Sequence, residues 1–108
     1  MTVNELIAGL QLQPLTLPDG DRKVEGAYIG DLLSWVMGRA QSGNAWITIM
    51  SNINIVAVAS LADVSCVILA EGVTVEPDVR KTAEQTGINL LTTERTAYEI
   101  ASELSKRI

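Results

Sequence analysis

Short apolar segments alternate with helix-like segments along most of this 108-residue chain. The clearest strand is Val64–Ala70, which is apolar at nearly every position, as expected for a strand buried on both faces of a parallel sheet. The segments Val24–Ile29, Ala45–Met50 and Ile88–Leu91 also read as strands, and a segment with helical character follows each of them. This alternation predicts an α/β fold: a three-layer sandwich with a mainly parallel sheet of about four to five strands and helices on both faces.

Residues that cap helices stand at most of the predicted helix boundaries. Thr2-Val3-Asn4-Glu5 has the form of a capping box at the start of a first helix. Asp31 is the predicted N-cap of the helix that follows Val24–Ile29, and Thr92-Thr93 is the predicted cap of the last helix. Pro77 suits the first position of a further helix, and Gly87 suits the position just after its end.

Two segments are harder to interpret. Ile53–Ala62 alternates like a strand, but a single strand over 45–62 would be unusually long, so we interpret it as a buried helix. Gln11–Leu17 is predicted to be extended, and Pro14 and Pro18 restrict it to an edge strand or a loop.

The composition narrows the class of function. A chain of 108 residues that is 47% hydrophobic is expected to form one domain over residues 1–108. The net charge of −5, with no Lys/Arg run longer than two residues, disfavours binding to nucleic acid or an anionic membrane. The N-terminus lacks the pattern of a signal peptide, and no apolar run reaches the ~18–20 residues of a membrane span.

The residue types also limit the chemistry. The chain has no histidine, which excludes Ser-His-Asp and Cys-His catalysis and His-ligated metals. The single cysteine, Cys66, excludes an internal disulfide and fits a reducing cytoplasm, which is the expected location. Neither of the glycine-rich phosphate motifs, G-x-x-x-x-G-K-[ST] and G-x-G-x-x-G, is present. We therefore predict no enzyme activity, no cofactor and no metal.

Small polar residues follow each predicted core strand. The carboxyl ends of parallel strands share one edge of a sheet, where ligands bind in a crevice. Helix N-termini at that edge favour an anionic group such as a phosphate. The candidate ligand-binding residues at the strand exits are Gly30, Asp31, Ser51, Asn52, Asn54, Glu71, Gly72, Thr92 and Thr93, and Arg22 is the candidate cation.

Each candidate has a purely structural alternative. Ser, Thr, Asn and Asp are ordinary capping residues, and Arg22 could form a local ion pair with Asp19 or Asp21 or instead reach across a cleft or dimer interface. Asp31 and Glu71 would repel a phosphate unless a cation such as Mg²⁺ lay between them.

Trp35, with Val36 and Met37, is the candidate anchor of an interface between protein chains. Trp35 falls beside the main apolar stripe of its helix, and tryptophan is enriched at the centres of interfaces. Placement in the core is the alternative.

The segment Asp21-Arg22-x-Val24-x-Gly26, followed by Tyr28-Ile29-Gly30-Asp31, resembles the DRTGG domain family. Trp46-Ile47-Thr48-Ile49 and Thr92-Thr93 also resemble stand-alone members of that family. The Asp-Arg pair and Gly26 match the motif, whereas Lys23-Val24-Glu25 stands where the family has Thr-Gly.

The resemblance implies a small α/β module that occurs alone, beside CBS domains in regulated pyrophosphatases, and within some phosphate acetyltransferases. Its fold is similar to the N-terminal domain of HPr kinase. In the larger proteins it looks like a regulatory or dimer-forming part, and no catalytic residues are associated with it. We therefore expect a non-catalytic cytoplasmic module that forms a homodimer and senses a small phosphorylated ligand or nucleotide. The alternative is a ligand-free adaptor for a separately encoded enzyme.

Overall fold

Five helices and five strands make up the computed structural model, which describes residues 1–108. In chain order the elements are α1 (Val3–Leu10), β1 (Gln13–Thr16), β2 (Gly26–Ile29), α2 (Leu33–Arg39), β3 (Asn44–Thr48), α3 (Asn54–Ala62), β4 (Cys66–Leu69), α4 (Pro77–Thr86), β5 (Leu90–Thr92) and α5 (Ala97–Ser105). The longest helix, α4, has 10 residues, and none of the helices could cross a bilayer.

The five strands form one sheet in the order β1-β5-β4-β3-β2. Strands β2 to β5 run parallel to one another, and β1 pairs antiparallel with β5. The predicted α/β fold with a mainly parallel sheet is therefore confirmed. Pro14 lies in the edge strand β1, next to an irregularity in its register, because proline cannot donate a hydrogen bond to a second neighbour.

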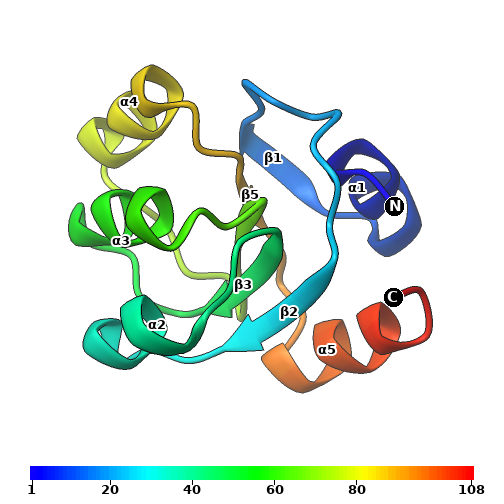
Figure 1. The fold of residues 1–108 in the computed structure, drawn as a ribbon. Helices are drawn as coiled ribbons and strands as arrows, with labels where there is room; N and C mark the ends of the chain where they lie inside the picture. The colour runs from blue at the N-terminus through cyan, green and yellow to red at the C-terminus, as the bar shows by residue number, and fades with distance from the viewer.

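Helices cover both faces of the sheet (Figure 1). The chain passes from β2 to β3, β4 and β5 by moving one strand at a time in the same direction. Crossovers of one hand then place α2, α3 and α4 on the same face. Helices α1 and α5 cover the other face, where the two chain ends also lie (Figure 1).

Each face of the sheet has its own hydrophobic core. Leu6 of α1 and Ile100 of α5 pack with Ile47 and Ile68 on one face. On the other face, Trp46 is fully buried against residues of α2, α3 and α4, and its indole N–H donates to the Gly30 carbonyl at 2.8 Å. The helical interpretation of Ile53–Ala62 is confirmed, because α3 buries four of its nine residues in this second core.

The capping predictions have mixed outcomes. Thr2 and Glu5 form the predicted capping box, and Pro77 and Gly87 bound α4 as expected. The prediction for Thr92-Thr93 is wrong: β5 continues through Thr92, and Thr96 caps α5. The prediction for Asp31 is also wrong, because Leu32 is the N-cap of α2 and the Asp31 carboxylate accepts hydrogen bonds from the end of β3 instead.

Candidate functional site

The chain diverges at the carboxyl ends of β4 and β5. After β4 it crosses to α4 on one face of the sheet, and after β5 it crosses to α5 on the other face. Two neighbouring parallel strands whose continuations leave in opposite directions form a topological switch point, where open α/β sheets bind ligands. The fold therefore selects this position as the candidate site.

Backbone hydrogen bonds hold the two diverging loops together. The Glu71 N–H donates to the Arg95 carbonyl at 2.8 Å, and the Gly72 N–H donates to the Thr93 carbonyl at 2.9 Å. Glu71 and Gly72 both have a positive φ, of 61° and 71°. The positive φ of Gly72 favours glycine, and the carboxylate of Glu94 occupies the space that a Cβ at this position would take. The base of the crevice is consequently a fixed backbone surface.

A cavity lies on each side of this backbone surface. The cavity on the α4 side has a volume of about 400 Å³, and the cavity on the α1 side has a volume of about 450 Å³. Both volumes fall within the range of small-molecule sites. The first is lined by Leu15, Gly72, Val73, Thr74, Val75, Pro77, Arg80, Thr92 and Glu94. The second is lined by Leu10, Gln11, Gln13, Thr92, Thr93, Glu94 and Arg95.

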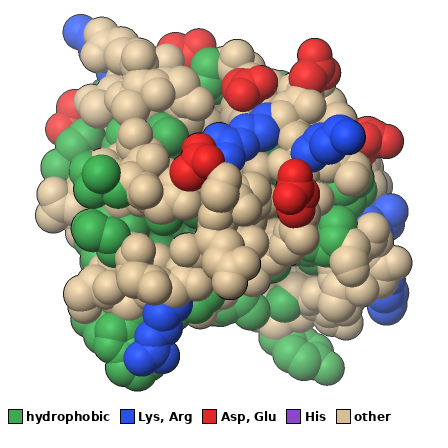
Figure 2. Space-filling model, in the orientation of Figure 1, with side chains coloured by type: hydrophobic (Ala, Val, Ile, Leu, Met, Phe, Trp, Pro, Cys, Tyr) green, Lys and Arg blue, Asp and Glu red, His purple; other side chains and the backbone are tan.

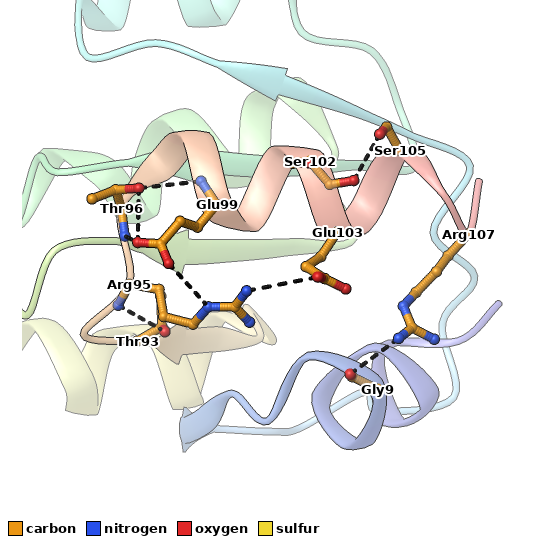
Figure 3. Close-up of polar contacts among 9 residues, drawn as sticks. All are labelled: Gly9, Thr93, Arg95, Thr96, Glu99, Ser102, Glu103, Ser105 and Arg107. Carbon is orange, nitrogen blue, oxygen red and sulfur yellow. Dashed lines mark hydrogen bonds and ion pairs between the residues drawn. The ribbon is translucent and has the colours of Figure 1, made fainter.

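The two cavities differ in whether the arginine that lines them pairs with carboxylates. In the α1-side cavity, Arg95 lies 3.9 Å from a carboxylate oxygen of Glu99 and 3.9 Å from one of Glu103 (Figure 3). The backbone N–H and the hydroxyl of Thr96 bond to Glu99 and lower its pKa, so Glu99 stays ionised beside Arg95. In the α4-side cavity, the Arg80 Nε donates to the Leu15 carbonyl at 2.9 Å, and no carboxylate forms an ion pair with Arg80.

The structure brings together only part of the predicted site. Glu71, Gly72, Thr92 and Thr93 meet at the switch point. The remaining strand-exit candidates, Gly30, Asp31, Ser51, Asn52 and Asn54, follow β2 and β3. Their polar groups serve local structure, since Asn52 accepts from the Asn54 N–H at 2.9 Å and Asp31 accepts from the Thr48 hydroxyl at 2.8 Å.

The pairing of Asp31 with Glu71 does not occur. The two residues follow β2 and β4, and β3 lies between those strands, so they are on the order of 10 Å apart along the sheet edge. No group of three or more Asp, Glu or Cys residues gathers closely enough in this structure to hold a metal ion.

Arg22 lies at the opposite edge of the sheet. It precedes β2, and its guanidinium pairs with Asp63, which precedes β4, at 2.9 Å. Neither Asp19 nor Asp21 is its partner. Because ligands of parallel sheets bind at the carboxyl edge, this position separates Arg22 from the crevice.

The three candidate interface residues differ in their exposure to solvent. Val36 lies on the buried side of α2 and is fully enclosed in the core, so it cannot contact another chain. Trp35 is 52% exposed and Met37 is 46% exposed. The guanidinium of Arg39 lies 3.7 Å from the centre of the Trp35 ring.

Sequence reasoning missed Arg80, Glu94 and Leu15. Arg80 is within a helix, Glu94 follows the strand exit by two residues, and Leu15 belongs to the edge strand. No local motif marks any of them. Only the sheet order, which places β1 beside β5, shows that they line one cavity.

The family follows from comparison with known proteins. The model of the DRTGG domain matches residues 19–107, and the chain therefore belongs to the DRTGG domain family. The fold is similar, with a TM-score of 0.74, to the crystal structure of the CBS and DRTGG domains of the regulatory region of Clostridium perfringens pyrophosphatase, complexed with its activator diadenosine tetraphosphate. The two sequences are 14% identical, and the similarity covers 95% of this chain but only 45% of that one. No curated protein matches the sequence.

Proposed function

We propose that this chain is a non-catalytic regulatory domain that binds a small phosphorylated ligand, most specifically a nucleotide, at the carboxyl ends of β4 and β5. The observation that carries the proposal is the switch point with a cavity on each side of it. The similar regulatory region of the Clostridium perfringens pyrophosphatase is complexed with a nucleotide activator, which supports this ligand class.

The polar groups around the crevice argue against a reaction at this site. The hydroxyl of Thr93 accepts a hydrogen bond from the Arg95 N–H at 3.2 Å, and the backbone of both loops is occupied in mutual hydrogen bonds. The chain has no histidine to serve as a base. Cys66 is buried within β4, and burial raises the pKa of its thiol to about 12, so it cannot act as a nucleophile near neutral pH.

A thermal-shift screen tests the binding proposal. The full chain is heated with adenine and guanine nucleotides, with diadenosine tetraphosphate and with inorganic phosphate. A ligand at a hundredfold its dissociation constant stabilises the folded state by about 2.7 kcal/mol. For a domain of this size each kcal/mol corresponds to roughly 4–8 °C in Tm. The absence of a shift across the whole panel would contradict ligand sensing.

We further propose that the domain self-associates as a homodimer through the exposed side of α2. Hydrophobic side chains are exposed on the α2 and α3 side of the molecule (Figure 2). Trp35 and Leu32, at 52% and 58% exposure, lie on one flank of α2 and would lose this exposed apolar surface in a dimer.

Light scattering tests the dimer. The expected mass is twice 11.6 kDa, and Trp35→Ala should weaken association without unfolding the chain. Tyr98→Ala is the matched control, because Tyr98 is a second exposed aromatic residue, 81% exposed, on α5. A monomer at high protein concentration would contradict self-association.

The exposed side of α2 also favours the second candidate function, a ligand-free adaptor for a separately encoded enzyme. An adaptor would bind that enzyme through Trp35 and would show neither a nucleotide-dependent shift nor a homodimer. The thermal-shift screen and the light-scattering measurement together therefore distinguish the two functions.

A further inference from the structure

We propose that the α4-side cavity binds a nucleoside monophosphate, with its phosphate at Arg80 and its nucleoside against Leu15, Val73 and Val75. This inference rests on the proposed function, and it adds the ligand class, the choice between the two cavities and the orientation of the ligand.

The position of the phosphate follows from the different partners of Arg80 and Arg95. The bond from Arg80 Nε to the Leu15 carbonyl uses one of the five guanidinium N–H groups and orients the side chain along the cavity wall. Its remaining N–H groups have no carboxylate partner. A guanidinium oriented in this way, although exposed, can bind a phosphate through charge-assisted hydrogen bonds. Arg95, in the other cavity, already lies between Glu99 and Glu103 (Figure 3).

The position of the nucleoside follows from the apolar wall of the same cavity. Leu15, Val73 and Val75 are half-buried and pack against the core beneath α4. Pro77 extends this wall to the first turn of α4. The volume of about 400 Å³ lies near the small end of the range for ligand sites, which suits one nucleoside better than a dinucleotide.

Glu94 provides a hydrogen-bond acceptor in the lining of the same cavity. No cation pairs with its carboxylate, which lies against Gly72 where the missing Cβ leaves room for it. An unpaired carboxylate beside a nucleoside site at a switch point can accept hydrogen bonds from ribose hydroxyl groups.

The charges around the cavity limit the number of phosphates. Arg80 is the single cation that lines it, whereas Glu94 lines it as an acid. Glu76 and Asp78 flank the lining residue Pro77, and Lys81 follows the lining residue Arg80, so two further carboxylates and one further cation lie nearby. One phosphate is matched by one guanidinium, and each further phosphate would meet carboxylates of like charge. The cavity therefore selects a monophosphate over a triphosphate when no divalent cation is present.

Isothermal titration of the full chain tests the assignment. The ligands are AMP, ATP and adenosine, and in parallel GMP, GTP and guanosine, all without divalent cations. We expect one monophosphate to bind at least tenfold more tightly than its nucleoside and its triphosphate. In Arg80→Gln the monophosphate should lose at least tenfold in affinity and should bind no better than the nucleoside. Lys81→Gln, which removes an exposed charge from the next position of α4, should bind like the wild type.

The outcomes that overturn the inference are distinct from one another. Full affinity in Arg80→Gln with a loss in Arg95→Gln would place the phosphate in the α1-side cavity and would leave the proposed function intact. Tightest binding of the triphosphate would overturn the monophosphate class alone. If the wild type binds none of these compounds and shows no thermal shift with any ligand, the proposed function fails as well. Should Arg80→Gln not fold, Thr74→Glu places a carboxylate at the same cavity without disturbing the Leu15 bond, and the same tenfold loss is expected.

Discussion

The guanidinium of Arg22 lies 2.9 Å from the Asp63 carboxylate and donates a 2.6 Å hydrogen bond to the Asp63 backbone carbonyl. Asp63 ends α3 with a positive φ of 57° and leads into β4. The arginine thus joins the segment before β2 to the turn before β4, across the intervening strand β3. Arg22, the arginine of the Asp-Arg pair that carries the resemblance to the family, is therefore part of the scaffold, on the edge opposite the crevice.

Removing this arginine should destabilise the fold modestly. Arg22→Ala loses the ion pair and the hydrogen bond to the carbonyl, and we expect a loss of about 1–2 kcal/mol in the free energy of unfolding. Asp63→Asn keeps the carbonyl bond and tolerates the left-handed conformation, so its loss should be below about 1 kcal/mol. Urea denaturation measures both values. Equal losses in the two variants would contradict the role given to the carbonyl bond.

The fold was predictable because local patterns and long-range packing agree. Val64–Ala70 is apolar throughout, and the structure places β4 in the middle of the sheet with every residue buried. Ile53–Ala62 is readable as a helix because a single strand over 45–62 would be unusually long, and α3 is buried along one side. Capping was less predictable, since Thr92, Thr93 and Thr96 are equally suitable caps until the length of β5 is known.

The candidate site was only half predictable. The strand-exit rule located Gly72 and Thr92, because it depends only on where strands end. It could not identify Arg80 or Leu15. These two residues are 65 positions apart along the chain and meet only through the hydrogen bond that joins α4 to β1. Asp31 is a residue type that often caps helices. In this structure its carboxylate instead accepts hydrogen bonds from two donors at the end of the neighbouring strand.

Asp31 should stabilise the link between β2 and β3. Its Oδ1 accepts from the Thr48 hydroxyl at 2.8 Å and from the Ile49 N–H at 3.0 Å. Asp31→Ala should cost about 1 kcal/mol in unfolding free energy, whereas Asp31→Asn retains an acceptor oxygen and should cost less. A double-mutant cycle with Thr48→Val measures the coupling. Strict additivity of Asp31→Ala and Thr48→Val would show that the hydrogen bond contributes nothing.

The two capping boxes should make stability depend on pH. Hydrogen bonds from the backbone N–H and the hydroxyl of Thr2 lower the pKa of Glu5, and the same groups of Thr96 lower the pKa of Glu99. Because the folded pKa lies below the unfolded value of about 4.3, this stabilisation is present above that pH and is lost as the pH falls through the lowered folded pKa.

Glutamine at both positions keeps the capping geometry and removes the titration. We therefore expect the Tm of the double variant Glu5→Gln/Glu99→Gln to fall less than that of the wild type between about pH 6 and pH 3. Asp63, whose pKa is lowered first by the Ser42 hydroxyl and then by Arg22, remains in both proteins and still contributes acid sensitivity. Parallel curves for the two proteins would contradict a contribution from the capping glutamates.

Cys66 should react with thiol reagents only when the chain opens. The side chain is fully buried in β4, so a reagent cannot reach the sulfur in the folded state. Burial also raises the pKa of the thiol to about 12, so the reactive thiolate is scarcely populated. Labelling with a disulfide reagent at about pH 8 should therefore be at least ~1000-fold slower in native buffer than in urea. Arg22→Ala should accelerate native labelling by roughly tenfold for each 1.4 kcal/mol of stability that it removes, provided that reclosing is faster than labelling. Rapid labelling of the wild type in native buffer would show that β4 is accessible without global opening, and it would contradict the buried position of Cys66.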